Sequence, residues 1–394
     1  MFFDTEFERE IIDRNIRTEA LRLAIGNGEL MLHYQPQVDM AAGRVLGVEA
    51  LVRWNHPTDG LLPPASFLDL IQDDEQLGMA LTQWVLNQAL NDLERLRDLG
   101  YTLGMSVNII IPALESMRAV FLDYLRKMLR QHASLEPELL ILEIVENVLI
   151  DDLSKATSTI NQMQKLGLKI SLDDFGTGFS SLSYLKHLSF DELKIDQGFV
   201  RDMLHDREDM TIVQAVISLS QSFGVPVIAE GVETARHADM LLRLGCTRAQ
   251  GYAISRPLAI DALVIWLRDW RPAPEWKHIA PMSSHFYPVA SMLSAHIGWG
   301  ESLEKYLRKE LVDPPILEMN ACEFGAILSL HQSTAERDDF SQKAIHCHEA
   351  LHAAGVAVLA AHQSADDAQA QVQLAQAVIL SKKLQTLILE HLQF

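Results

Sequence analysis

The sequence predicts an α/β fold, in which a TIM-like (β/α)8 barrel is followed by an all-α four-helix bundle. Short apolar strand patterns alternate with helical patterns through residues 1–270, and a closed barrel is the natural arrangement for about eight such units. A linker is expected at 271–284, because three prolines lie within ten positions there. From 285 to 394 the spacing of Leu, Ile, Ala and Val is helical, which predicts a bundle.

The expected elements follow the chain in order. A helix with one apolar face is expected over residues 4–26, and a short turn at Ala42 and Gly43 joins the first two strands. Strands are expected at 31–38, 45–54, 102–108, 139–144, 168–172, 192–195, 225–229 and 248–252. Helices are expected at 65–73, 75–99, 116–132, 153–166, 207–223 and 234–244, and in the second domain at 287–311, 315–331, 338–360 and 364–392.

The charge balance is strongly acidic. Asp and Glu number 53 against 33 Lys and Arg, which gives a formal net charge of −20. This balance argues against a nucleic-acid duplex or an anionic membrane as a general partner. A small anionic ligand can still bind, provided that metal ions or local arginines receive it.

Cysteine usage and the N-terminus bear on the compartment. Cys246, Cys322 and Cys347 are too few for a disulfide framework and indicate a reducing environment. The N-terminal stretch carries charges throughout, so no signal peptide is expected, and no run reaches the roughly 18 apolar residues of a membrane-spanning helix. We therefore expect a soluble cytoplasmic protein.

Two adjacent carboxylates mark the stretch from 168 to 185. The apolar residues of LKISL alternate as in a strand and lead into Asp173 and Asp174, after which Gly176 and Gly178 turn the chain. Neighbouring carboxylates with nothing basic beside them stay ionised cheaply only when a cation lies between them. A pair of divalent metal ions is the expected cation, since one carboxylate can bridge two ions. The plainer alternative is a helix N-cap followed by a turn.

Polar residues also end most of the other predicted strands, where barrels of this class keep their active sites. Any one of them has a plain explanation as a solvated rim residue, but six strand ends in register do not. Carboxylates with one carboxamide form an oxygen-rich site that suits Mg²⁺ or Mn²⁺ rather than zinc. The residues are Glu49, Arg53, Asn108, Glu143, Glu146, Asp173, Asp174, Lys194, Asp196, Glu230 and Gln250.

Six segments of the first domain form a set of motifs: YQPQVD from Tyr34, EALVRW from Glu49, DDFGTGFSSLSYL from Asp173, LKID from Leu193, EGVET from Glu230 and QGY from Gln250. Together they resemble the signature motifs of the EAL family, whose members are phosphodiesterases that open cyclic di-GMP. The resemblance covers about residues 10–268 and keeps every motif in the family's order. It implies a barrel with a two-metal site that hydrolyses one phosphodiester bond to give linear 5'-pGpG.

The resemblance also implies a role for each matching residue. Asp173 would bridge two Mg²⁺ or Mn²⁺ ions, Lys194 would orient and polarise the attacking water, and Gln250 would hold that water. The implied metal ligands are Glu49, Asn108, Glu143, Asp173 and Asp174, with Glu230 close to the pair; Lys194, Glu230, Gln250 and Glu49 are the implied catalytic residues; Gln35, Leu51, Arg53 and Asp196 would bind the substrate; and Glu146 and Glu233 would support the loop after Asp174.

Histidines are concentrated in the second domain. His348 and His352 are four residues apart on one predicted helix, which lets both imidazoles reach one ion. The string HEALH also fits the HExxH pattern of zinc peptidases, in which Glu349 would act as general base. A plain helical bundle with incidental histidines is another interpretation.

A third interpretation uses more of the sequence. His296 begins HIGW, Cys322 begins CEFG, and HEALH follows, so that three histidines and one cysteine can form a closed structural or sensory zinc site. In this order the motifs are similar to the chemoreceptor zinc-binding domain, a four-helix module attached to chemoreceptors and cyclic di-GMP enzymes. The resemblance covers about residues 285–392 and implies one Zn²⁺ held by His296, Cys322, His348 and His352.

We expect a cytoplasmic cyclic di-GMP phosphodiesterase whose activity is regulated by zinc bound to the C-terminal bundle. The expected cofactors are two Mg²⁺ or Mn²⁺ ions in the barrel and one Zn²⁺ in the bundle, and a homodimer is expected, without nucleic-acid duplexes or membranes as partners. Two alternatives remain, a catalytically silent cyclic di-GMP receptor and a zinc-binding interaction module whose barrel is vestigial. Turnover with Mg²⁺ or Mn²⁺ separates the enzyme from the first, and nucleotide affinity excludes the second.

Overall fold

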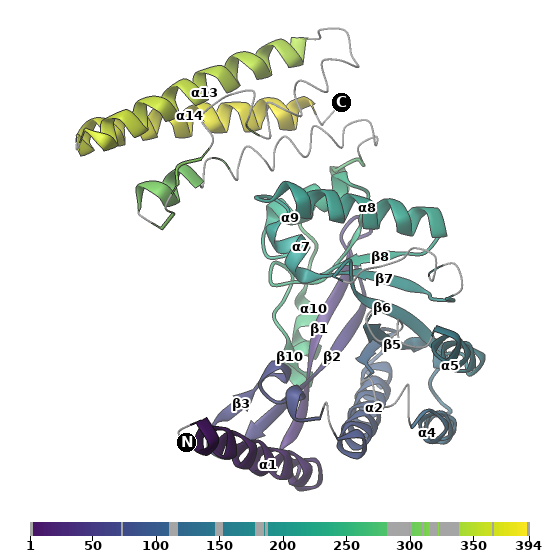
Figure 1. Ribbon diagram of the computed structural model, residues 1–394. Coiled ribbons are helices and arrows are strands. Elements are labelled where there is room, and N and C mark those ends of the chain that lie inside the picture. The colour runs from purple at the N-terminus through teal and green to yellow at the C-terminus, as the bar shows by residue number, and fades with distance from the viewer. Residues whose placement is uncertain are drawn as a thin grey trace. The chain divides into compact units, whose positions relative to one another are not determined.

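The chain divides into two compact units, each described here by itself. The first consists of Met1–Asp196, Ser220–Thr234 and Thr247–Lys277, and the second of Gln197–Leu219, Ala235–Cys246 and His278–Phe394. The domain boundaries predicted from the sequence stay a prediction. The structure, a computed structural model, describes residues 3–71, 74–109, 117–145, 153–177, 185, 188–281, 299, 302–308, 310–311, 313–315, 322, 339–364 and 366–391 (Figure 1).

Eight strands of the first unit close into a barrel, as predicted. Around the barrel they follow the order β1, β9, β8, β7, β6, β5, β4 and β2, and pairing of β2 with β1 closes the ring. Two short strands, β3 and β10, extend the sheet at β2 and β1. The strands are β1 (Leu30–Asp39), β2 (Arg44–His56), β3 (Gly60–Leu62), β4 (Gly104–Asn108), β5 (Leu140–Val145), β6 (Lys169–Phe175), β7 (Glu192–Ile195), β8 (Val227–Ala229), β9 (Arg248–Ala249) and β10 (Leu258–Ala259).

Strand β1 runs antiparallel to both of its barrel neighbours, β2 and β9. The other neighbouring pairs of the barrel, which are β2–β4, β4–β5, β5–β6, β6–β7, β7–β8 and β8–β9, are parallel. The cause is the predicted short turn after β1, since a turn of a few residues can join only antiparallel strands. Gly43 has a φ of 64° in this turn, and its N–H donates to the Asp39 carbonyl oxygen at 2.8 Å. Glycine adopts that backbone conformation without steric cost.

Helices connect the parallel strands and complete both units (Figure 1). The first unit contains α1 (Phe3–Asn27), α2 (Glu75–Asp98), α4 (Arg118–Gln131), α5 (Leu153–Lys165) and α10 (Ile260–Asp269). The second contains α7 (Gln197–Asp202), most of α8 (Arg207–Phe223), α9 (Ala235–Arg243), α13 (Asp339–Gln363) and α14 (Asp367–His391).

The helix predicted at 65–73 is wrong. Two short 3-10 turns, Pro64–Ser66 and Leu68–Ile71, occupy this segment instead. Pro63 has an extended backbone, with ψ at 163°, and Pro64 follows it at the start of the first turn. Proline disfavours a helical conformation in the residue before it and lacks the N–H that a longer helix would use.

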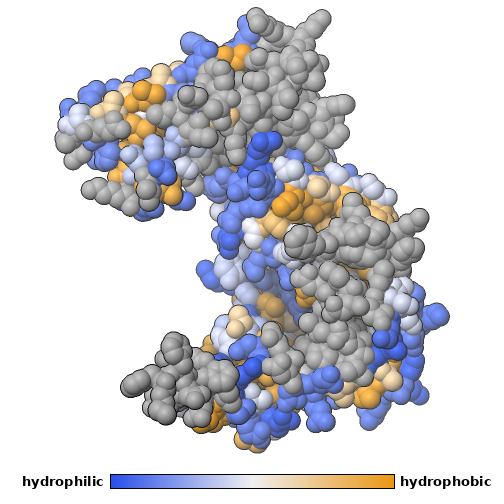
Figure 2. Space-filling view, in the orientation of Figure 1, coloured by the Kyte–Doolittle hydropathy of each residue, from blue (hydrophilic) through white to orange (hydrophobic). Residues whose placement is uncertain are grey.

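The helix α1 matches its predicted span, but its apolar residues do not share one face. Among its described side chains, Leu21 and Ala24 are buried, whereas Ile12, Ile16 and Leu23 are 56%, 61% and 57% exposed. The prediction of a single apolar face is therefore correct only in part. On the face of the molecule shown in Figure 2, hydrophobic residues form separate patches among hydrophilic ones.

Helices α13 and α14 pack against each other along a seam with a seven-residue repeat (Figure 1). Such a repeat keeps a buried stripe facing a partner helix over many turns. The buried positions with this spacing are Ala344, Cys347, Leu351, Ala354, Val358 and Ala361 on α13, and Ala370, Ala377, Leu384 and Ile388 on α14. The predicted helices at 338–360 and 364–392 are thus confirmed, whereas those at 287–311 and 315–331 lie mostly outside the described residues.

One segment, Gln342–His362, is long and apolar enough by length and composition to cross a membrane. In the structure, however, 56% of the most apolar 18-residue stretch of this segment is buried inside the protein, along the seam with α14. Core helices pass the same test. We therefore assign the segment to the packing of the helices.

Close contact between β2 and β4 generates a first testable prediction. A Cβ atom on Gly47 would lie 2.6 Å from the carbonyl oxygen of Gly104, a backbone atom that cannot move independently of its strand. We expect Gly47→Ala to lower the free energy of unfolding by about 1–3 kcal/mol, as overpacking does in other cores.

Gly26→Ala is the matched control. Nothing lies within 4 Å of the added Cβ, and the residue belongs to α1, so this variant should be unchanged or more stable by up to about 1 kcal/mol. Urea unfolding followed by circular dichroism measures both variants. A Gly47→Ala chain as stable as Gly26→Ala would show that the two strands are not packed this closely.

Candidate active site and candidate metal centre

A fully buried lysine, Lys194 on β7, lies at the centre of the predicted site. Its ammonium nitrogen lies 2.6 Å from Glu230 Oε1 and 2.9 Å from Glu143 Oε2. Asp173 Oδ1 is 3.1 Å away, and Glu49 Oε2 is 3.8 Å away. Four carboxylates that are far apart in the sequence therefore meet at one ammonium group, as the strand-end pattern predicted.

Two carboxamides join the same cluster. Asn108, the last residue of β4, donates from Nδ2 to Glu49 Oε1 at 2.7 Å and to Glu143 Oε2 at 3.1 Å. Gln250, directly after β9, donates from Nε2 to Glu49 Oε2 at 2.5 Å and to Gln35 Oε1 at 3.1 Å. The carboxamides therefore fix the orientation of the acids from both sides of Glu49.

Alternation along the strands explains why these residues meet. In β7 the side chains of Leu193 and Ile195 point away from Lys194, because neighbouring residues of a strand face opposite sides. The cross-strand register aligns Asn108 with Glu143, so their side chains lie next to each other at the ends of β4 and β5. The C-terminal ends of the parallel strands then form one rim.

The cluster holds more negative charge than its lysine balances. Burial disfavours the charged form of Lys194, but the surrounding carboxylates, Asp173 first, outweigh it and raise the pKa of Lys194 well above its usual value. Burial raises the pKa values of Glu143 and Glu230 well above the ordinary range, in spite of the attraction of Lys194. Glu49 differs, since Lys194 and the carboxamide hydrogen bonds overcome its burial and lower its pKa. One ammonium therefore cannot neutralise four acids.

Asp174 has a backbone conformation that few residue types tolerate. Its φ is 53°, in the left-handed region where Asp and Asn are enriched among residues other than glycine. Its N–H donates to Asp173 Oδ1 at 3.0 Å, which directs the two carboxylates differently. Burial, and then repulsion from Asp173 and Asp196, raises the pKa of Asp174 to about 6.

The residues present fit divalent metal ions. Asp173, Asp174 and Glu230 each offer an oxygen, and these oxygens lie within 4.8 Å of one another. Among the described residues, Glu143 Oε1 is buried without a hydrogen-bond partner, as a carboxylate oxygen is when a cation is needed to satisfy it. All of these metal-ligand atoms are oxygens, which Mg²⁺ and Mn²⁺ prefer.

The residues predicted to bind substrate lie next to this cluster along their strands. Gln35 is buried and donates to the Ser255 carbonyl oxygen at 3.1 Å. Leu51 and Arg53 follow Glu49 at two-residue steps on β2, so they share its face, and Arg53 is half-buried. Asp196, just after β7, lies close enough to Asp174 to raise its pKa.

Of the two residues predicted to support the loop, one can be placed. Glu233 is exposed in the segment before α9. Glu146 lies outside the described residues, as do most residues of the loop that it was predicted to anchor.

Sequence reasoning missed a polar layer beneath the cluster. Glu192 is buried, accepts from Arg248 Nη1 at 3.1 Å and from Ser171 Oγ at 3.4 Å, and has its pKa raised by burial. Each of these residues stands two positions before a site residue on its strand. Gln37 was missed as well. It stands two positions after Gln35 and donates to Gln250 Oε1 at 2.9 Å. A spacing of two along the predicted strands could have identified all four.

A second cluster of metal-ligating side chains lies on the C-terminal helices. Cys322 Sγ lies 3.2 Å from His348 Nε2, and the ring centroids of His348 and His352 are 4.5 Å apart. All three residues are buried, and their ligand atoms lie within 4.8 Å of one another. His296, the fourth predicted ligand, lies outside the described residues.

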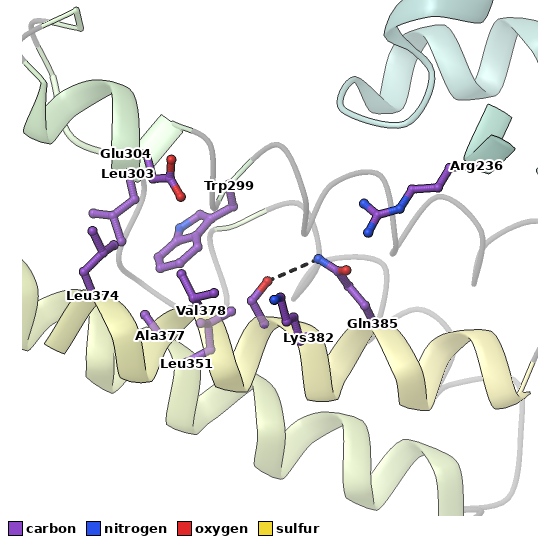
Figure 3. Close-up of a pocket in the computed structure, with 11 residues that line it drawn as sticks. Arg236, Trp299, Leu303, Glu304, Leu351, Leu374, Ala377, Val378, Lys382 and Gln385 are labelled. Carbon is purple, nitrogen blue, oxygen red and sulfur yellow. Dashed lines mark hydrogen bonds between the residues drawn. The ribbon is translucent and has the colours of Figure 1, made fainter. Parts of the chain in front are cut away.

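The surroundings of this cluster disfavour the peptidase interpretation. Glu349 would have to reach a metal-bound water, yet its side chain is exposed, whereas both histidines are buried. The ring of Trp299 covers His352, with centroids 4.8 Å apart. Figure 3 shows Trp299 above Leu351 and Val378, beside a pocket between the helices. The histidines thus face packed side chains rather than an open catalytic position.

Comparisons with known proteins agree with the geometry. Residues 18–257 match the family model described as the EAL domain. The bifunctional diguanylate cyclase/cyclic di-GMP phosphodiesterase MucR of Pseudomonas aeruginosa is 37% identical over 263 residues, 67% of this chain and 38% of that protein. The cyclic di-GMP phosphodiesterase NbdA of the same organism is 39% identical over 270 residues, 67% of this chain and 34% of that protein. The chain thus spans less than two fifths of the length of these relatives.

A solved structure gives the same result. The PaMucR phosphodiesterase in its c-di-GMP complex is 39% identical, with a TM-score of 0.60, and the similarity covers 63% of this chain and 99% of that one. The matched family model covers more than half of the chain and includes every residue of the acidic cluster. The chain belongs to the EAL domain family.

Proposed function

We propose that this protein hydrolyses cyclic di-GMP to linear 5'-pGpG with two Mg²⁺ or Mn²⁺ ions at the rim of its barrel. The observation that carries the proposal is the convergence of Glu49, Glu143, Asp173 and Glu230 on the single ammonium group of Lys194. Bound cations would balance this excess of buried carboxylates, in place of the protonation of some of them. Relatives named as cyclic di-GMP phosphodiesterases support the choice of substrate.

The ligands divide between two metal positions. Glu49, Asn108, Glu143 and Asp173 would hold the first ion, and Asp173 with Asp174 the second, with Glu230 close to both. Bound divalent metals supply Lewis-acid stabilisation of the phosphoryl oxygens and make hydroxide available near neutral pH. The bent backbone at Asp174 suits this division, because it lets two consecutive residues direct their carboxylates to one site.

The remaining residues would bind the dinucleotide and orient the attacking water. Lys194 Nζ, held among the acids, can donate hydrogen bonds to the attacking water. Gln250 is fixed by Gln37 and Glu49, so its carboxamide can orient the same water. Arg53 lies on the face of β2 that bears Glu49 and offers a guanidinium to a phosphate oxygen. Gln35, Leu51 and Asp196 would contact the dinucleotide.

A catalytically silent cyclic di-GMP receptor is the alternative. It would need the substrate contacts but not a complete metal set. Every implied metal ligand is present in this chain, and those named above surround Lys194 or lie beside it. We therefore favour the enzyme.

The first test of the proposal is Glu49→Ala. Removing this carboxylate takes away a ligand of the first metal and the acceptor of both Asn108 and Gln250, so turnover should fall at least about a hundredfold, as it does when an electrostatic contact to the transition state is lost. Nucleotide binding should persist in part, because Arg53 remains. Production of pGpG in saturating Mn²⁺ and calorimetric titration of cyclic di-GMP measure the two effects.

Glu138→Ala is the matched control, since Glu138 is exposed in the turn before β5 and should be dispensable. Full turnover by Glu49→Ala in metal-replete buffer would contradict the two-metal assignment. No turnover by the unmodified protein, together with cyclic di-GMP binding, would favour the receptor.

We also propose that the C-terminal helices form a zinc-sensing module resembling the chemoreceptor zinc-binding domain. Buried thiol and imidazole groups within 4.8 Å of one another support a closed zinc site, with His296 as the fourth ligand. Zinc would regulate hydrolysis in the barrel. Excess zinc can also displace magnesium from the carboxylates, so inhibition alone does not identify the sensor.

Cys322→Ala separates these two effects of zinc. It removes the thiolate and should weaken zinc binding by orders of magnitude while leaving the barrel carboxylates intact. The measurement is turnover against buffered free zinc at saturating Mg²⁺. The response at low free zinc should disappear in Cys322→Ala and persist in Cys347→Ala, which removes a buried cysteine outside the cluster. Superimposable curves for Cys322→Ala and the unmodified chain would assign the zinc effect to the barrel.

A further inference from the structure

The ammonium group of Lys194 lies among the carboxylates that are proposed to bind the metal ions. It lies within 3.1 Å of oxygens of Glu230, Glu143 and Asp173, so three carboxylates are within ion-pair distance of one charge. The same carboxylates are the implied metal ligands or lie next to the metal pair. Lys194 and the metals therefore compete for the same oxygens.

We propose that Lys194 serves as the cation of this site whenever no metal is bound, and that metal loading is an exchange in which its ammonium gives up carboxylates to the incoming ions. The proposal rests on the two-metal function above. It adds a role in the metal-free protein, where Lys194 keeps the acids together until metal arrives.

The charges of the described residues set the direction of two effects of Lys194, one on the stability of the barrel without metal and one on its affinity for metal. With Lys194 in place, four carboxylates share one positive charge, which lowers their mutual repulsion in a buried site. The same charge repels a divalent cation that enters beside it. Lys194 should therefore stabilise the empty barrel and weaken metal binding.

A scaffolding role for Lys194 would have the opposite effect on metal binding. If the lysine only held the acids in the geometry that metals need, its removal would loosen the ligands and weaken metal affinity. Cation exchange instead requires that removal of the charge strengthens metal affinity. The sign of the change decides between the two roles.

The test compares Lys194→Met with Lys169→Met in the full chain. Methionine keeps much of the apolar stem without the charge, and Lys169 is an exposed lysine at the start of β6. Competition with a chelating dye gives the Kd for Mn²⁺, and thermal unfolding with and without Mn²⁺ gives the stability of each state. Neither readout requires turnover, which Lys194→Met is expected to lose.

We expect Lys194→Met to bind the first Mn²⁺ at least about tenfold more tightly than the unmodified chain, which corresponds to about 1.4 kcal/mol. Its metal-free Tm should be lower than that of Lys169→Met, and Mn²⁺ should raise its Tm by a larger amount. Lys169→Met should match the unmodified chain in both measurements. Equal or weaker Mn²⁺ binding by Lys194→Met would overturn the proposal.

Lys194→Arg is the second variant, in case Lys194→Met does not fold without metal. It keeps the positive charge and offers more N–H donors to the same carboxylates, so it should fold and bind Mn²⁺ more weakly than the unmodified chain. Mn²⁺ binding by Lys194→Arg as tight as that of the unmodified chain would also overturn cation exchange. If the unmodified chain binds no Mn²⁺, the proposed function itself fails, so the two failures are distinguishable.

Discussion

The repulsion among four buried carboxylates is the constraint on which the site depends. Only Lys194 lies within ion-pair distance of all four among the described residues, and its side chain has no exposed surface. The barrel must therefore supply enough packing and hydrogen bonding to hold these groups together. Asn108 and Gln250 contribute hydrogen bonds, and the Glu192–Arg248 ion pair lies two positions below along β7 and β9.

Much of this arrangement follows from the periodicity of the sequence. Alternation in strands and the common direction of β2 and β4 to β9 were enough to predict that Glu49, Asn108, Glu143 and Lys194 would meet at one rim. The same spacing of two could have identified Glu192 and Arg248, but it could not have paired them. Arg248 contacts Glu192, 56 positions away, and nothing in the local pattern of either residue indicates the other.

Local chemistry explains the remaining differences from the sequence predictions. The apolar spacing after Pro64 resembles a helix, but proline restricts the preceding residue and removes a donor, so two short turns form instead. The φ of Asp174 could not be predicted, because the preceding residues, LKISL from Leu168, alternate like an ordinary strand. Conversely, the histidine pair was predictable, since a spacing of four on a helix places His348 and His352 on one side.

The central claim is that the acids around Lys194 bind two divalent metal ions. Crystals of the full chain grown with Mn²⁺, with diffraction data collected above and below the manganese absorption edge, test it most directly. The account predicts two strong anomalous peaks, one contacted by Glu49, Asn108, Glu143 and Asp173 and the other by Asp173 and Asp174, with the Lys194 ammonium moved from its metal-free contacts. Absence of both peaks at saturating Mn²⁺, with Lys194 still within ion-pair distance of all four acids, would contradict it.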